Sequence, residues 1–271
     1  MRIDQRNNGA ATTGVVNTVA YICDRFYFQN ATGATVTIQR STTAPTGFTH
    51  SAYVTVTSAG TPAYGFIQQN VEGFNSASLG MNSASSNITI SFWVRSSLTG
   101  TYSVSVQDSA YGCSYNATYS INAANTWEYK SVVIPGYASG TWNTDNTQGM
   151  AIRFALVNSV SGTANTWVNS SQSGSTTNVN WFGTSGATFY LTGVQVEEGS
   201  VATPFERRLY TTELALCQRY YYGGSSFYLY GLAGYGELTN LVGFGVSLPV
   251  PMRTQPSVTN TSDSKIGRAH V

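Results

Sequence analysis

Residues 87–109, NITISFWVRSSLTGTYSVSVQDS, hold two strand patterns separated by a turn signal at Thr99-Gly100. In each pattern apolar residues alternate with polar or amphipathic ones: Ile88, Ile90, Phe92 and Val94 against Thr89, Ser91, Trp93 and Arg95, then Tyr102, Val104 and Val106 against Ser103, Ser105 and Gln107. A period of two places one set of side chains on the buried face of a β-strand and the other on its outward face. This stretch therefore predicts two half-buried strands.

The same alternation recurs along most of the chain, in segments 115–121, 127–136, 150–159 and 187–197. Many short strands at regular spacing favour an antiparallel sandwich over a fold with alternating helices. We expect residues from about 20 to 196 to form one sandwich, with these side chains inside it: Ile90, Phe92, Val104, Val106, Val133 and Phe154. Segment 161–186 shows the weakest pattern, and within it residues 171–177 are of low complexity and predict a long exposed loop.

The composition excludes several classes of protein. Of the 271 residues only 9% are charged, against about 25% in an average domain, while 13% are aromatic. A chain so rich in aromatic residues is unlike a disordered one, and a net charge of +1 without a basic run does not indicate nucleic-acid binding. No apolar stretch approaches the roughly 20 residues of a membrane span. The neutral, amide-rich profile is typical of an extracellular or virion β-protein.

One short charged segment interrupts the β-patterns. In residues 193–224 we expect a helix over 211–222, capped by Thr211 or Thr212 and ended by Gly223. Its apolar face of Leu214, Cys217 and Tyr221 should dock on β-structure, because a helix this short is not stable alone. Cys217, Cys23 and Cys113 are odd in number and widely spaced, which indicates isolated buried thiols and not a disulfide framework or a zinc site.

Two groups of motifs resemble known families. ITISFWVRSSLTGTYSVSVQDS (88–109) and NTWEYKSVVIPG (125–136) resemble the middle of jelly-roll carbohydrate-binding modules. Residues 186–221, GATFYLTGVQVEEGSVATPFERRLYTTELALCQRYY, and the opening MRIDQRNNG resemble bacteriophage tail-fibre and other tail proteins. The resemblance implies an all-β, antiparallel jelly-roll β-sandwich followed by a short linking helix and a truncated second β unit.

The expected domain limits follow from these motifs. We expect the jelly-roll sandwich in residues 1–203, a linker with the short helix in 204–224, and the start of a second β domain in 225–265. The last six residues, IGRAHV (266–271), resemble the translation of a sequencing adapter, so we expect them to be unpacked. Met1 is interpreted as an internal methionine.

The sequence departs from the carbohydrate-binding modules at two points. Thr192 stands where those modules often place an acidic residue that helps to bind a structural calcium ion. Trp93 is the one aromatic residue that clearly alternates away from the buried set. We therefore predict no metal and no cofactor, and we treat sugar binding as one hypothesis among several.

No catalytic motif is present in the sequence. With His270 set aside, His50 is alone, and neither a triad nor a metal cluster can be assembled around it. Asp24, Glu72, Asp108, Glu128 and Asp145 would supply the acid pair of a glycosidase only if folding brought two of them together. We therefore predict that the protein is not an enzyme.

Three functions remain open at this stage. The leading hypothesis is a virion structural protein, part of a phage tail fibre or tail appendage, that binds a bacterial surface polysaccharide and other tail proteins. We expect a homo-oligomer, a trimer in the full-length fibre, with no nucleic acid and no membrane as partner. The alternatives are a carbohydrate-binding module of a secreted glycan-active enzyme and a polysaccharide depolymerase. Aromatic stacking and side-chain amides bind sugars, so the predicted glycan-binding residues are Trp93, Arg95, Gln68 and Gln107 on one outward face, with Trp142, Trp167 and Trp181 near loops.

Overall fold

The computed structural model of the protein describes residues 1–157, 162–223 and 248–257. The chain divides into two units, residues 1–207 and 208–271. Apart from residues 248–257, the predicted second β unit (225–265) lies outside the described residues. The predicted adapter segment (266–271) lies entirely outside them, so both predictions remain predictions.

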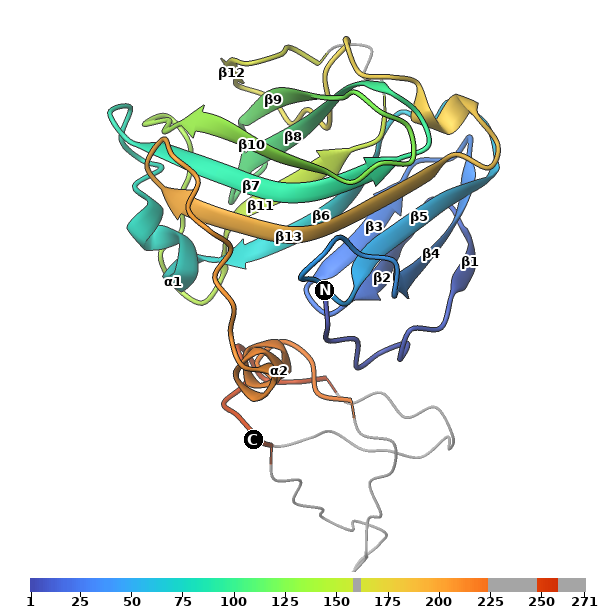
Figure 1. Ribbon diagram of the computed structural model, residues 1–271. Coiled ribbons are helices and arrows are strands. Elements are labelled where there is room, and N and C mark those ends of the chain that lie inside the picture. Colours follow the sequence, from blue (N-terminus) through green and yellow to red (C-terminus); the bar gives the residue numbers. More distant parts are fainter. Residues whose placement is uncertain (158–161, 224–247, 258–271) are drawn as a thin grey trace, which may run out of the picture. The chain divides into compact units, whose positions relative to one another are not determined.

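Unit 1 is an antiparallel jelly-roll sandwich of two sheets (Figure 1). The six-stranded sheet has the order β1 (Thr12–Val15), β4 (Thr35–Ser41), β5 (Ser51–Ser58), β13 (Thr188–Glu198), β7 (Asn87–Ser96) and β10 (Glu128–Pro135). The seven-stranded sheet has the order β12 (Trp167–Val168), β9 (Ser114–Ile121), β8 (Gly100–Asp108), β11 (Gln148–Ala155), β6 (Gly65–Glu72), β3 (Phe26–Asn30) and β2 (Val19–Cys23). The all-β fold class predicted from the alternation is thus confirmed.

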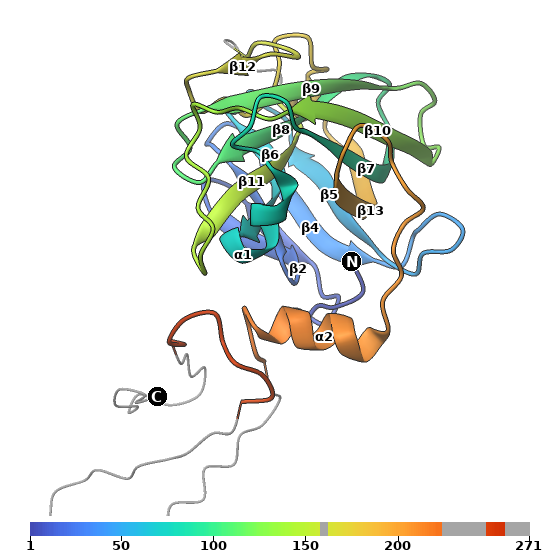
Figure 2. The same cartoon turned by 90° about the vertical axis from the view of Figure 1, so that its left-hand side faces the viewer.

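Helical structure in unit 1 is confined to short turns. They are α1 (Gly73–Ser76), the 3₁₀ turn η1 (Ala77–Leu79) and the 3₁₀ turn η2 (Trp181–Gly183). Figure 2 shows α1 beside β11, which it contacts. α1 and η1 together follow β6, and η2 precedes β13, so these turns lie in the connections between strands.

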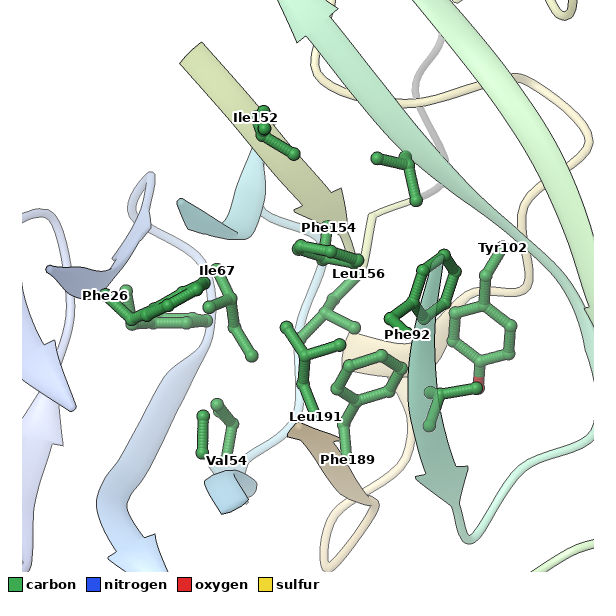
Figure 3. Close-up of a cluster of buried hydrophobic side chains, with 14 of the residues drawn as sticks. Phe26, Val54, Ile67, Phe92, Tyr102, Ile152, Phe154, Leu156, Phe189 and Leu191 are labelled. Carbon is green, nitrogen blue, oxygen red and sulfur yellow. The ribbon is translucent and has the colours of Figure 1, made fainter. Parts of the chain in front are cut away.

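The core lies between the two sheets, and its aromatic side chains come from both of them (Figure 3). Phe92 on β7, Phe154 on β11 and Phe189 on β13 are fully buried. Tyr102 on β8 is fully buried as well, and its hydroxyl pairs with Ser96 Oγ and donates to the Leu98 carbonyl, both at 2.9 Å. A buried phenol needs such partners, because an unpaired hydroxyl in the core costs free energy.

One predicted core residue is placed wrongly. Val133 is 42% exposed, whereas its neighbours Val132 and Ile134 are buried. In the β10–β7 register Val132 faces Ile90 and Ile134 faces Ile88, so both point inward, while Val133 faces Thr89 on the outer side. The error is a register shift of one residue, which reverses every side chain of a strand. The other predicted core residues, Ile90, Phe92, Val104, Val106 and Phe154, are fully buried.

The predicted exposed loop covers a sheet face instead. Ser105 Oγ and Gln107 Nε2 on β8 donate to the Gln172 carbonyl oxygen at 3.0 and 2.5 Å, and Ser114 Oγ on β9 donates to the Ser170 carbonyl at 2.7 Å. Segment 170–173 therefore lies over β8 and β9. The outward residues Ser103, Ser105 and Gln107 are buried under this part of the chain, although their alternation was predicted correctly.

Unit 2 contains the predicted helix. α2 runs from Tyr210 to Gln218, so its existence is confirmed, but its start is not at Thr211 or Thr212. Leu209 occupies the N-cap position with extended backbone and no side-chain cap, and both threonines lie within the first turn. Cys217 is the buried residue of the helix, and the docking of its apolar face on β-structure remains a prediction. Among the described helices none is both long and apolar enough to cross a membrane.

Candidate functional site

The four outward residues predicted to share one face lie on opposite sides of the sandwich. Trp93 and Arg95 belong to β7 in the six-stranded sheet, whereas Gln68 on β6 and Gln107 on β8 belong to the seven-stranded sheet. β7 and β8 follow each other in the chain but enter different sheets. Their outward side chains therefore point in opposite directions, and the prediction of one shared platform is wrong.

Three of the predicted sugar-binding residues have no exposed surface: Gln68, whose contacts are described below, Gln107 and Trp181. Gln107 is fully buried, with Nε2 on the Gln172 carbonyl and Oε1 accepting from Ser171 Oγ at 3.0 Å. Trp181 is fully buried too, and its indole nitrogen donates to the Thr188 carbonyl at 3.3 Å. In this structure none of the three side chains is open to a ligand.

Trp142 and Trp167 come together in one aromatic cluster with Tyr137. The Tyr137 and Trp167 rings stack with centroids 4.9 Å apart, and Trp142 packs edge-on against Trp167 at 5.9 Å. Trp142 Nε1 donates to the Tyr137 carbonyl at 2.9 Å and Trp167 Nε1 to the Pro135 carbonyl at 2.8 Å. Both indole N–H groups are therefore engaged within the protein, which suits a role in holding the loops.

The seven-stranded sheet carries a polar row across its outer face. The strand registers place one residue of each of five neighbouring strands side by side: Tyr27 on β3, Gln68 on β6, Arg153 on β11, Ser105 on β8 and Asn116 on β9. We call these five residues the transverse row. A row of hydrogen-bonding side chains at strand spacing, about 4.8 Å per strand, offers repeated donors and acceptors along one line.

Arg153 stands at the centre of the transverse row. Its Nε donates to Gln68 Oε1 at 2.6 Å and its Nη1 to Ser173 Oγ at 3.1 Å. The guanidinium carbon lies 4.4 Å from the ring centroid of Phe66 and 4.9 Å from that of Tyr111. The side chain is thus clamped between an amide, a hydroxyl and two aromatic rings, and only 9% of the residue is exposed.

Amide and phenol groups continue the network beside Arg153. Gln68 Nε2 donates to Asn70 Oδ1 and to the Tyr111 hydroxyl at 3.2 Å, and that hydroxyl donates to Gln148 Oε1 at 2.9 Å. Asn70 is exposed, and Tyr111 is half-buried. These groups present neutral donors and acceptors at the surface.

Tyr27 is the last residue of the transverse row on the side of β2. Its ring meets Tyr21 edge-on with centroids 5.7 Å apart, and the Arg6 guanidinium lies 3.8 Å from the Tyr21 centroid. Partial burial, and to a lesser extent the neighbouring Tyr111 phenol, raise the pKa of Tyr27 well above its ordinary value. The phenol is therefore a neutral hydrogen-bonding group at every physiological pH.

The loop covers one half of the row and leaves the other open. Asn116 Nδ2 donates to the Thr163 carbonyl and to Gln172 Oε1, both at 3.0 Å, so the β8 and β9 end lies under segment 163–173. Tyr27 and the neighbouring Asn70 keep exposed surface. We take Tyr27, Gln68 and Arg153 of the row, with the neighbouring Asn70 and Tyr111, as the candidate functional site and call it the polar face.

Sequence reasoning found Gln68 but missed the rest of the polar face. The signal was present at Arg153, a charged residue in the otherwise apolar run MAIRFALV (150–157). A charge in a buried strand has a structural or binding partner. Tyr111 could not be found by periodicity, because it lies outside the strands, with a positive φ of 57°.

The carboxylates considered for catalysis have other partners. Asp24 accepts from Gln5 Nε2 at 2.5 Å and pairs with Arg6 at 3.3 Å. Asp108 accepts from the backbone of Gly112 and Thr141 at 2.7 and 2.9 Å. Each of these carboxylates therefore holds neighbouring segments of the chain.

Glu128 and Asp145 are engaged in the same way, and Glu72 is buried. Partial burial opposes ionisation of Glu128, but Lys130 Nζ at 2.6 Å and the Asn122 and Ala123 amides outweigh it and lower its pKa. Asp145 accepts from the Thr147 amide at 2.9 Å, and its contacts with Thr147 lower its pKa.

The position expected for a calcium ligand is filled by a hydrogen bond. Thr192 is fully buried, and its hydroxyl donates to the His50 carbonyl at 2.8 Å. In the described part of the chain no group of three or more His, Cys, Asp or Glu residues is placed to hold a metal ion.

Comparison with solved structures gives jelly-roll carbohydrate-binding modules and a phage tailspike domain. No family model matches the sequence, and no curated protein resembles it. The enzymatically active domain of bacteriophage CBA120 tailspike protein 4 is 15% identical over 64% of this chain and 19% of its own, with a TM-score of 0.36. The chain thus spans about a fifth of that protein.

Two Clostridium thermocellum structures are similar in the same sense. The family 11 carbohydrate-binding module in complex with a β-1,3-1,4-mixed-linked tetrasaccharide is 14% identical over 68% of this chain and 93% of its own, with a TM-score of 0.33. The joined binding and catalytic modules of endo-1,4-beta-D-xylanase 10B, complexed with xylohexaose, are 12% identical over 72% of this chain and 30% of theirs, with a TM-score of 0.38.

Proposed function

We propose that unit 1 is a carbohydrate-binding module that binds a glycan on the polar face. The observation that carries the proposal is the network joining Gln68, Tyr111 and Arg153, with the exposed Asn70 at its edge. Sugars present hydroxyls that pair with amides and phenols, and apolar ring faces that pack on aromatic rings. Because the network fixes these side chains before a ligand arrives, little conformational entropy is lost on binding.

The proposal is tested with the complete chain and a panel of bacterial surface polysaccharides, by affinity electrophoresis followed by calorimetry. We expect a dissociation constant between millimolar and micromolar, equivalent to about 4–8 kcal/mol. Tyr27→Ala and Asn70→Ala should weaken binding while Trp93→Ala, on the opposite sheet, leaves it unchanged. If no polysaccharide of the panel binds, the proposal is wrong.

The six-stranded sheet offers a second candidate surface around Trp93 and Arg95. Trp93 and Tyr129 pack with centroids 5.6 Å apart, and the Arg95 guanidinium lies 5.2 Å from the Tyr190 ring centroid. Tyr129 is 46% exposed. These aromatic side chains support glycan contact on this face as well, and loss of binding in Trp93→Ala with unchanged binding in Tyr27→Ala would assign the site there.

We further propose that the module belongs to a phage tail fibre or tail appendage and acts outside the cell, on the virion. The support is the resemblance of residues 186–221 to tail proteins, together with the attachment of residues 203–207 to the sandwich. Phe205 packs edge-on against Phe48 with centroids 5.1 Å apart, and the Glu206 amide donates to Gln195 Oε1 at 2.7 Å. A segment held in this way transmits load between a binding module and the chain that follows.

The competing assignments are a binding module of a secreted glycan-active enzyme and a depolymerase. The complete reading frame and its genomic neighbours decide between them. Genes for virion components on both sides, and the protein in the proteome of purified particles, are the expected result. A hydrolase domain in the same frame would favour the enzyme. The expected trimer is checked by light scattering on the full-length product.

A further inference from the structure

Arg153 is a buried cation without an acidic partner among the described residues. Its contacts are the Gln68 amide oxygen, the hydroxyls of Ser173 and Ser171 at 3.1 and 3.5 Å, and the two aromatic rings. The ion pairs found in the described residues involve Arg6, Arg40 and Lys130 instead. The neighbours that influence the charge of Arg153 most are tyrosines, Tyr111 before Tyr27 and Tyr64.

The guanidinium is held by neutral groups and keeps a small exposed part. Nε is used by Gln68 and Nη1 by the serines. Tyr111 acts on the charge both through its phenol and as a hydrogen-bonding neighbour. The 9% of Arg153 that remains exposed lies near the exposed Asn70, which bonds to Gln68.

Burial of a cation is costly unless an opposite charge or a full set of acceptors compensates it. Burial lowers the pKa of Arg153, which is the sign of incomplete compensation. Amide oxygens, hydroxyls and ring faces stabilise the charge as dipoles and quadrupoles, without neutralising it. A carboxylate arriving at the exposed part of the guanidinium would form a charge-assisted hydrogen bond, which is about twice as strong as a neutral one.

From this geometry we propose that the polar face selects acidic polysaccharides, with the carboxylate of a uronic-acid residue bound at the Arg153 guanidinium. This inference rests on the proposed function and adds the class of sugar to it. Arg6, the other cation on this face, is already paired with Asp24 at 3.3 Å. One uncompensated positive charge therefore calls for a singly charged group at one sugar position, and neighbouring neutral sugars contact Asn70 on β6 and Tyr27 on β3.

The experiment compares each polysaccharide with its own carboxyl-reduced form. Hyaluronan, alginate and polygalacturonate are converted chemically so that each carboxylate becomes a hydroxymethyl group, and dextran and a neutral galactan complete the panel. Binding is measured by calorimetry with the complete chain. Carboxyl reduction should lower the affinity of the polymer that binds by about 10- to 100-fold, the worth of a charge-assisted hydrogen bond.

Variants of the protein supply the matching test. Arg153→Gln should remove the preference for the acidic polymer, and Arg153→Lys should keep part of it, because the charge remains without the planar geometry. Lys130→Gln, which removes a cation from the opposite sheet, is the control and should bind as the wild type does. Thermal unfolding of each variant separates loss of the fold from loss of binding, and the carboxyl-reduced polymers test the idea on wild-type protein alone.

The outcomes separate the two proposals. Equal binding of an acidic polymer and its reduced form, or an Arg153→Gln variant that keeps the preference, would overturn the acidic-sugar inference and leave glycan binding intact. Binding to dextran or galactan alone would likewise overturn the acidic-sugar inference and leave glycan binding intact. If no polymer binds, both the proposed glycan binding and the preference for acidic sugars are wrong.

Discussion

Phe92 on β7 packs edge-on against Phe154 on β11, with ring centroids 5.1 Å apart and an interplanar angle of 78°. The two strands belong to different sheets, so this pair joins the halves of the sandwich. Tyr119 on β9 meets Phe92 in the same manner at 5.0 Å. Edge-to-face rings at this distance contribute beyond the area they bury, which makes Phe92 a centre of the core.

Phe92→Ala should therefore lower the free energy of unfolding by about 3–5 kcal/mol, because it leaves a cavity between rigid aromatic neighbours. Urea unfolding followed by tryptophan fluorescence measures the change. Val133→Ala, on the exposed side of β10, is the control and should cost less than about 0.5 kcal/mol. Similar losses in both variants would contradict the register described here.

Asp108 fixes the loop that begins at the end of β8. Its carboxylate is buried and accepts from the backbone of Gly112, Cys113 and Thr141 at 2.7, 3.2 and 2.9 Å. Asp108→Ala should cost about 2–4 kcal/mol in unfolding free energy, since it leaves buried N–H groups without an acceptor. Asp108→Asn should cost less, because the amide oxygen can still accept from one side. An Asp108→Ala variant as stable as the wild type in the same urea assay would refute this role.

The strand pattern could be predicted from the sequence because each strand has a buried face. Ile90, Phe92, Val104 and Val106 lie where the alternation places them. The alternation also gave the outward side of β7 and β8, as for Trp93 and Gln107, whereas on β10 it was placed one residue out at Val133. It could not say which sheet a strand joins, since pairing between strands distant in the chain leaves no periodic trace. The prediction that Trp93, Arg95, Gln68 and Gln107 share one platform was wrong for that reason.

The candidate site could be predicted only in part. Gln68 was identified, but whether an outward residue is exposed depends on what lies over it. Segment 170–173 covers Gln107 through two hydrogen bonds, one from Gln107 Nε2 to the Gln172 carbonyl and one from Ser171 Oγ to Gln107 Oε1. The polar sequence of this segment does not differ from that of an exposed loop. Tyr111 enters the site through a turn, where neither period of two nor helical period applies.

The buried thiols should make the protein sensitive to alkali. Burial raises the pKa of Cys23 to about 12, and the carboxylates of Asp4 and Asp24 raise it further while the amino terminus and Arg25 oppose them. Burial raises that of Cys113 to about 12 as well. An unfolded thiol loses its proton near pH 8.5, so between about pH 9 and 12 the folded chain holds more protons than the unfolded chain. The contribution of these thiols to the free energy of unfolding is therefore fully present below about pH 8.5 and is lost as the pH rises through this window.

Urea unfolding at pH 7.5, 9 and 10.5 tests this expectation, and Cys23→Ser reduces the dependence if the thiol is responsible. In the native protein at pH 8 a thiol reagent should label Cys23, Cys113 and the buried Cys217 slowly compared with the denatured chain. A thiol that reacts at the denatured rate would show that its surroundings open freely. For Cys217 that result would also remove the docking predicted for α2.

Gln68 and Gln107 form a matched pair for separating binding from support of the loop. Both are fully buried on the outer side of the same sheet, but Gln68 holds Arg153 and Gln107 holds Ser171 and the Gln172 carbonyl. Gln68→Ala leaves Arg153 Nε without its acceptor, so it should lower stability by about 1–3 kcal/mol and weaken glycan binding. Gln107→Ala releases segment 170–173, so limited proteolysis with mass spectrometry should find new cuts there.

The two variants should differ in both measurements. Proteolysis of Gln68→Ala should match the wild type within segment 170–173, because the Gln172 carbonyl still accepts from Ser105 and Gln107. Binding by Gln107→Ala should change less than binding by Gln68→Ala, since Gln107 does not contact Arg153, whereas Gln68 accepts from its Nε. Equal loss of binding in the two variants would mean that the glycan contacts segment 170–173 and not the polar face.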